Sequence, residues 1–297
     1  MIRRPPRSTQ GVSSAASDVY KRQVLVHPFA KSLIMIEGLI IFSFLGMFVV
    51  LVAGMFGIGG GTLIVPVLIA SFLSYGFEET VIIHLAIGSS MASIFFTGIA
   101  SAYAHKKKDA IDFDILKPVT FGIIFGAFLG ALFALQLSGD LLKKIIAFFA
   151  LFAAIRIGLS IEFKSDNKKP KNLLSYLAGS GIGFLSSILG IGGGMFSVPY
   201  FKGYGLSMKM SVGTAAACGI PIALFASFGY FFMGLNNTSL PNLSLGYIYI
   251  PAVLGISMTS VFAAKYGAYL AHYLKENTLK RLMVSLLLII CLYMAII

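Results

Sequence analysis

Two glycine clusters are the stretches of this chain whose composition could bind a ligand directly. One runs from Gly57 to Gly61 and the other from Gly190 to Gly194, each with four glycines in five positions inside a long apolar run. Glycine costs about 1 kcal/mol relative to alanine in a helix interior, so each cluster predicts a break in a helix. A helix that restarts after the break points unpaired amides and its positive dipole end toward the break. We therefore predict that the breaks bind an anion without a buried cationic side chain.

Hydroxyl side chains could donate hydrogen bonds to the same anion. Ser89 and Ser90 follow Gly88 after the first cluster, and Thr214 holds the equivalent place after the second cluster. The alternative is that these hydroxyls cap or link helices and that the glycines only allow close helix packing. The predicted substrate-binding residues are the glycines of both clusters with their neighbouring hydroxyls: Gly57, Gly59, Gly60, Gly61, Thr62, Ser89, Ser90, Gly190, Gly192, Gly193, Gly194, Gly213 and Thr214.

Two ionisable residues, His84 and Glu37, lie in or near apolar runs, where such groups are functional hypotheses. A histidine can exchange a proton near neutral pH, so we predict both as candidates for proton coupling. The alternative places both at the membrane–water interface. The other histidines, His27, His105 and His272, are scattered without metal-ligand spacing, so the sequence favours no metal, no cofactor and no enzyme.

The composition requires a membrane protein. Of 297 residues, 58% are hydrophobic and only 11% are charged, whereas about a quarter of a soluble domain is charged. The net charge of +12 lies largely in short loops between apolar runs, which indicates membrane orientation rather than nucleic-acid binding. We predict an all-α, multi-pass protein of the cell membrane whose partners are the lipid bilayer and a small anion. Cys218 and Cys291 lie in apolar stretches and are predicted to be buried thiols.

The first residues do not match the rest of the chain. Residues 1–23 are basic and polar and read like translated adapter DNA fused in frame, so we predict a non-native or disordered leader over 1–32. The alternative is a genuine basic tail. The apolar run 33–56 can span a bilayer core of about 30 Å, whereas 63–73 is too short to cross alone. Further apolar segments cover 81–103, 117–136, 141–161, 172–190, 195–206, 211–235, 245–272 and 279–297.

The landmarks of the chain occur twice in the same order, which predicts two transmembrane repeats over 33–165 and 166–297. Besides the glycine clusters, Pro118 pairs with Pro251, and Gly130 pairs with Gly267. Each repeat would hold one glycine-broken or re-entrant helix and about three further transmembrane helices. Internal duplication is typical of transporters whose site lies between the repeats.

Loop charge distinguishes two topologies, because positive residues collect on the cytoplasmic side. If each broken region crosses the membrane once, nine positive residues lie on one side and seven on the other. If the chain turns back at the glycines, the count becomes 13 against three. The second topology is favoured, and it makes the two halves inverted copies with both chain ends away from the cytoplasm.

With these residues in view, the chain resembles the sulfite exporter TauE/SafE family over residues 33 to 297. The resemblance implies a permease for sulfur oxyanions or organosulfonates, often an exporter. The sequence departs from the family at Ser89, commonly threonine, and at Ala215, commonly serine. The segments that carry the resemblance are the two glycine clusters with Pro66 and Pro199, Ala86 to Ser90, Ser211 to Thr214, Leu245 to Tyr247, and Lys265 to Ala268.

The sequence therefore favours a secondary transporter of small anions that works by alternating access. A passive anion channel is the nearest alternative. A membrane enzyme would need a convergent acid, base or metal set, and a scaffold would not need two broken helices.

Overall fold

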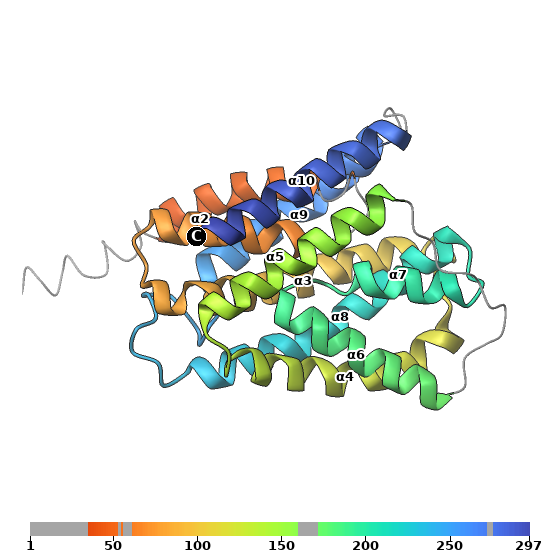
Figure 1. Cartoon of the computed structure of the whole chain (residues 1–297), viewed down its shortest axis with the longest axis horizontal. Coiled ribbons are helices and arrows are strands. Elements are labelled where there is room, and N and C mark those ends of the chain that lie inside the picture. Colours follow the sequence, from red (N-terminus) through yellow and green to blue (C-terminus); the bar gives the residue numbers. More distant parts are fainter. Residues whose placement is uncertain (1–34, 53–54, 56–60, 160–171, 272–275) are drawn as a thin grey trace, which may run out of the picture.

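The computed structural model describes residues 35–52, 55, 61–159, 172–271 and 276–297. The predicted leader and the glycines from Gly57 to Gly60 lie outside this part of the chain. Within it the protein is all-helical, with no strand beyond one isolated bridge between Ser244 and Tyr249 (Figure 1). A first helix, Met35–Val52, precedes α2 Gly61–Ser74, α3 Glu79–Lys106, α4 Phe113–Ala134, α5 Gly139–Gly158, α6 Asn172–Leu189, α7 Gly194–Gly203, α8 Met208–Gly234, α9 Ile250–Ala271 and α10 Glu276–Ile296.

Six helices are long and apolar enough to cross a membrane: the first helix, α3, α4, α6, α8 and α10. Large apolar side chains cover the outside of the bundle, and Phe121, Phe148 and Phe262 are each about 70% exposed. Such a surface suits lipid rather than water, because soluble proteins do not expose apolar area on this scale. The predicted all-α, multi-pass membrane class is confirmed.

Helices α3 and α8 form the centre of the bundle and run antiparallel. Gly98 of α3 lies beside Ile220 of α8, whereas Gly88, nearer the start of α3, lies beside Tyr230, nearer the end of α8. Both helices bury small and polar residues that allow this close approach. The turn after α3 therefore lies at the end of the bundle where α8 begins.

Helix α4 runs parallel to α6 at a very short distance. A Cβ on Gly122 would collide with the carbonyl oxygen of Tyr176, and one on Gly126 would collide with that of Ser180. Glycines spaced by four residues thus give α4 a flat face for the α6 backbone. Asp112 starts α4 as its N-cap, accepting hydrogen bonds from the amides of Asp114 and Ile115 at 3.0 and 3.1 Å.

The chain turns back at the second glycine cluster. Helix α6 ends at Leu189 and α7 begins at Gly194. Helix α7 then returns alongside α6, because Gly193 lies near Ser186 while Tyr200 lies near Ser175 at the start of α6. Figure 1 shows α7 running back toward the end from which α6 comes.

The first helix and α2 make a similar pair. The ring of Phe42, early in the first helix, lies 5.9 Å from that of Phe72, late in α2. The two helices therefore also run in opposite directions, although most of the first glycine cluster lies outside the described residues.

The two helix pairs start from opposite ends of the bundle. The first helix runs parallel to α9, since Gly38 lies beside Pro251 and Gly46 beside Ile256. Helix α6 runs parallel to α4, which begins at the other end of the bundle. This arrangement brings the lysines of α7 and of the start of α8 to the end where α3 stops.

The predicted segment 245–272 begins too early. Helix α9 starts at Ile250, and residues 235–249 form an ordered loop. Leu243 and Gly246 have φ of +70° and +56°, and such left-handed residues cannot continue a helix. Apolar composition alone did not reveal this loop because it is folded inward against α3.

Candidate functional site

The second glycine break lies against the start of α2 inside the bundle. A Cβ on Gly61, the first residue of α2, would lie 2.7 Å from the Cα of Ile191 and 2.8 Å from the carbonyl oxygen of Gly190. Ser90 of α3 donates a hydrogen bond of 2.9 Å to the same carbonyl. The start of α2, the middle of α3 and the α6–α7 break therefore meet at one place.

Two left-handed glycines shape the break. Gly190 has φ of +72° and Gly193 has φ of +76°, a conformation that costs other L-residues about 1–2 kcal/mol. The Ile191 amide donates to the Ser186 carbonyl at 3.0 Å, and the Ser197 amide donates to the Gly193 carbonyl at 2.8 Å. The Phe196 amide also donates to the Gly193 carbonyl, at 3.0 Å, so only the amides of Gly194 and Met195, the first two residues of α7, are left without an acceptor in their own helix. They give it the positive end of a helix dipole.

Nine buried hydroxyls have no hydrogen-bond partner among the described residues, and three of them lie near the breaks: those of Thr62, Ser186 and Ser197. Ser186 and Ser197 are fully buried, and each Oγ lies 3.5 Å from the position of a Cβ on Gly193. Buried hydroxyls are nearly always paired, so this cluster needs a reason. Thr62 is among the residues predicted from the sequence, whereas Ser186 and Ser197 are not. The sequence gives no sign of these two serines beyond their position within four residues of the second cluster.

Ser89 and Thr214 lie elsewhere and anchor loops in this structure. The Tyr249 amide donates to the Ser89 Oγ at 2.8 Å, and the Asp112 amide donates to the Thr214 Oγ1 at 3.0 Å. We call the pairs Gly88–Ser89 and Gly213–Thr214 the loop anchors. Each glycine admits a loop carbonyl, from Tyr247 and Ala110 respectively, where a Cβ would collide. In this state both hydroxyls accept hydrogen bonds from backbone amides, and their contact with substrate stays a prediction.

The two coupling candidates do not contact the glycine break. His84 is buried in α3, and its Nε2 lies 3.2 Å from the carbonyl oxygens of Ala134 and Leu137. Because carbonyl oxygens only accept hydrogen bonds, Nε2 carries the proton. Glu37 is exposed on the first helix. Their role in coupling stays a prediction.

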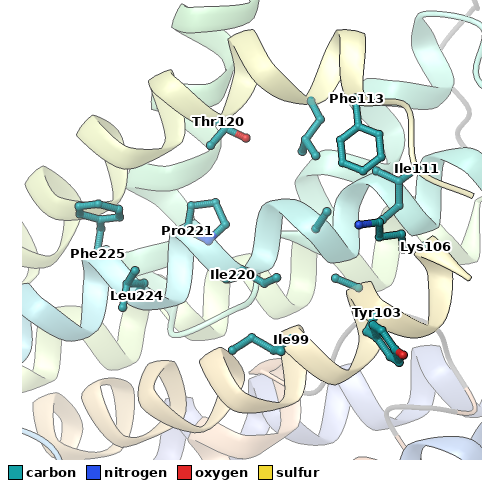
Figure 2. Close-up of a pocket in the computed structure, with 13 residues that line it drawn as sticks. Ile99, Tyr103, Lys106, Ile111, Phe113, Thr120, Ile220, Pro221, Leu224 and Phe225 are labelled. Atoms are coloured by element: carbon teal, nitrogen blue, oxygen red, sulfur yellow. The ribbon is translucent and has the colours of Figure 1, made fainter.

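An open groove of about 440 Å³ lies between α3, α4 and α8. Figure 2 shows Tyr103 and Lys106 at one end and Leu224 and Phe225 at the other. Apart from Tyr103, Lys106 and Thr120, its lining is apolar, so it offers too few donors for a desolvated anion. The groove lies close to the second break, because its wall residue Ile220 follows Gly219, whose Cβ position lies 3.0 Å from the Gly192 carbonyl oxygen.

Broken helices that meet inside a polytopic bundle are a feature of membrane transporters. The chain belongs to the sulfite exporter TauE/SafE family, whose model matches residues 42–294. It is a multi-pass membrane protein of a transporter family, not an enzyme family.

Curated relatives carry the same general description. A "probable membrane transporter protein" of Haemophilus influenzae is 38% identical over 232 residues, which is 77% of this chain and 87% of the relative. A "probable membrane transporter protein" of Methanocaldococcus jannaschii is 29% identical over 254 residues, covering 84% and 92% of the two chains. No solved structure matches this chain significantly.

Proposed function

We propose that this protein transports small anions by alternating access between two inverted halves, residues 33–165 and 166–297. The observation that carries the proposal is the meeting of the α2 start with the α6–α7 break. Two helix N-termini directed at one buried place can hold a negative charge without a cationic side chain.

The loop anchors support the alternating mechanism. The Ser89 anchor holds the loop between α8 and α9 at one end of the bundle, and the Thr214 anchor holds the turn between α3 and α4 at the other. In each case a Gly-hydroxyl pair on a central helix of one half holds a loop of the other half. Release of one anchor at a time would open the central site to one side of the membrane.

The substrate class follows from the family, whose name refers to sulfite export. Sulfur oxyanions and organosulfonates carry several acceptor oxygens, which suit the backbone amides and hydroxyls at the break. We propose that the transported anion belongs to this class.

The test is uptake and efflux in inverted vesicles with labelled sulfite, thiosulfate, sulfoacetate and taurine. We expect saturable flux of at least one of them. Gly193→Leu should abolish flux while the protein remains in the membrane, because the new side chain would collide with Ile222 and would be strained at a φ of +76°. Gly60→Leu should act in the same way on the first cluster. Flux that survives both substitutions would contradict the proposed site.

A passive anion channel is the second candidate. A transporter should give flux that saturates and follows an imposed proton gradient, whereas a channel should follow the anion gradient alone. His84→Gln and Glu37→Gln test the coupling candidates. If one of these residues carries the coupling proton, we expect flux in its variant to stop following the proton gradient. Unchanged gradient dependence in both variants would exclude these two residues.

A further inference from the structure

We propose that Ser186 and Ser197 are substrate-binding residues, and that the site they form selects oxyanions with a single negative charge. This inference rests on the proposed function and names the ligand groups and the substrate charge at the α6–α7 break.

The two hydroxyls converge on one point of the chain. Ser186 lies one turn before the end of α6 and Ser197 lies in the first turn of α7. Each Oγ is 3.5 Å from the Cβ position of Gly193, and neither has a partner among the described residues. Both residues are fully buried. An anion at the start of α7 would accept from both hydroxyls and from the first amides of the helix.

A glycine at position 193 leaves room for the ligand. The end of the Ile222 side chain lies against Gly193 in this structure. A change of the Ile222 rotamer would free this space, and the terminal carbon is the flexible end of its side chain. In this structure the Ile222 side chain takes the space that the proposed ligand would need, and the two hydroxyl oxygens lie 3.5 Å from the same Cβ position.

The charge of the ligand follows from what surrounds it. Among the described residues, the buried polar side chains are serines, threonines and His84, and none is a lysine or an arginine. His84 is held at the end of α4 by the carbonyls of Ala134 and Leu137. The cost of desolvating an ion grows with the square of its charge, so hydroxyls and amides alone can compensate for a monoanion far better than for a dianion. Hydrogen bonds from several directions also favour an oxyanion over a halide.

The experiment compares methanesulfonate, a monoanion at neutral pH, with sulfate, a dianion, in proteoliposomes that contain the full chain. Wild-type protein should exchange methanesulfonate with saturation, and sulfate should compete poorly. Ser186→Ala and Ser197→Ala should each raise KM for methanesulfonate roughly tenfold or more, because each removes a hydrogen bond to a charged acceptor.

A matched control is available at the next residue. Ser187 is also fully buried in α6, but its Oγ donates to the Gly183 carbonyl at 2.8 Å. Ser187→Ala should leave KM unchanged. A second readout is the rise in Tm caused by methanesulfonate, which Ser186→Ala and Ser197→Ala should reduce. Their Tm without ligand should not fall, because neither hydroxyl has a partner to lose.

Four outcomes separate the claims. Raised KM in the two serine variants only, with poor competition by sulfate, supports the inference. Saturable flux that neither serine variant changes overturns the role of the serines and leaves the proposed function standing. Equal competition by sulfate and methanesulfonate overturns the charge selection. Absence of both flux and a ligand-induced Tm shift contradicts the proposed function and this inference together.

Discussion

At the residue scale, the backbone conformation at the α6–α7 break is what places donors at one point. Gly193 combines a φ of +76° with a Cβ position that the Ile222 side chain occupies. Only glycine satisfies both conditions without strain. The residue is therefore needed for the fold of the break as well as for the space beside it.

We predict that Gly193→Ala lowers the free energy of unfolding by about 1–2 kcal/mol from the left-handed conformation alone, and lowers flux. Gly181→Ala is the control, because that residue lies exposed in α6 with nothing within 4 Å of its Cβ position. Alanine there should stabilise by about 0.5–1 kcal/mol, as expected within a helix. Thermal unfolding in detergent measures the stability of both variants, and the vesicle assay measures their flux. Equal Tm and flux in the two variants would contradict the account of Gly193.

The sequence predicted the glycine break but not the two serines that we propose to bind the anion beside it. Four glycines in five positions of an apolar run predict a break because each costs about 1 kcal/mol relative to alanine in a helix interior. Ser186 and Ser197 could not be recognised, because serine inside a membrane helix usually bonds to its own helix, as Ser187 does. Only the three-dimensional arrangement shows that these two hydroxyls have no partner in the part of the chain that the structure describes.

At the scale of elements, the loop anchors explain why Gly-Ser and Gly-Thr pairs recur in the two central helices. The glycine admits a loop carbonyl and the hydroxyl accepts a loop amide, so each pair holds a loop through two backbone groups. The sequence revealed the repeated pairs, but their function as anchors depends on contacts about 100 or more residues apart in the chain.

We predict that Ser89→Ala accelerates hydrogen exchange at the Tyr249 amide and that Thr214→Val does so at the Asp112 amide. Each substitution removes the acceptor of a partly or fully buried amide, at a cost of about 1–3 kcal/mol. Mass spectrometry of exchanged peptides over 107–112 and 235–249 measures the effect. Ser93→Ala is the control, because its Oγ bonds only within α3, to the Ser89 carbonyl at 2.9 Å. The account of the anchors fails if protection of both loops is the same in all three variants.

The same scale explains which helices were predicted well. Long apolar runs such as 81–103 and 211–235 correspond closely to α3 and α8, because length and hydropathy decide a membrane helix. The predicted start of α9 was wrong because the last loop residues, 245–249, are apolar and continue directly into the helix. The backbone amides of this stretch bond within the loop, to the Tyr230 carbonyl of α8 and to Ser89 of α3, so an apolar stretch can leave the helix without a polar signal in the sequence.

At the scale of the whole molecule, the helix directions and the lysine distribution agree. The ends of α3 and α7 and the start of α8 lie together and carry basic residues, whereas the loop 235–249 at the other end carries none. Positive loops face the cytoplasm. The end with Lys106 to Lys108 should therefore be cytoplasmic.

We predict that a membrane-impermeant thiol reagent applied to intact cells labels Thr238→Cys but not Lys108→Cys. Lys108→Cys should react only after the membrane is opened. Both variants are made in a chain with Cys218→Ala and Cys291→Ala. Labelling of Lys108→Cys from outside, without labelling of Thr238→Cys, would show that the orientation is opposite to the predicted one.

The most direct test of the central claim is to locate a bound anion in an experimental structure of the protein. Selenite resembles sulfite, and the anomalous scattering of selenium identifies its position without ambiguity. We predict a selenium peak within hydrogen-bonding distance of the first amides of α7, beside Ser186 and Ser197. A peak in the groove between α3, α4 and α8, with none at the glycine breaks at a saturating concentration, would contradict it.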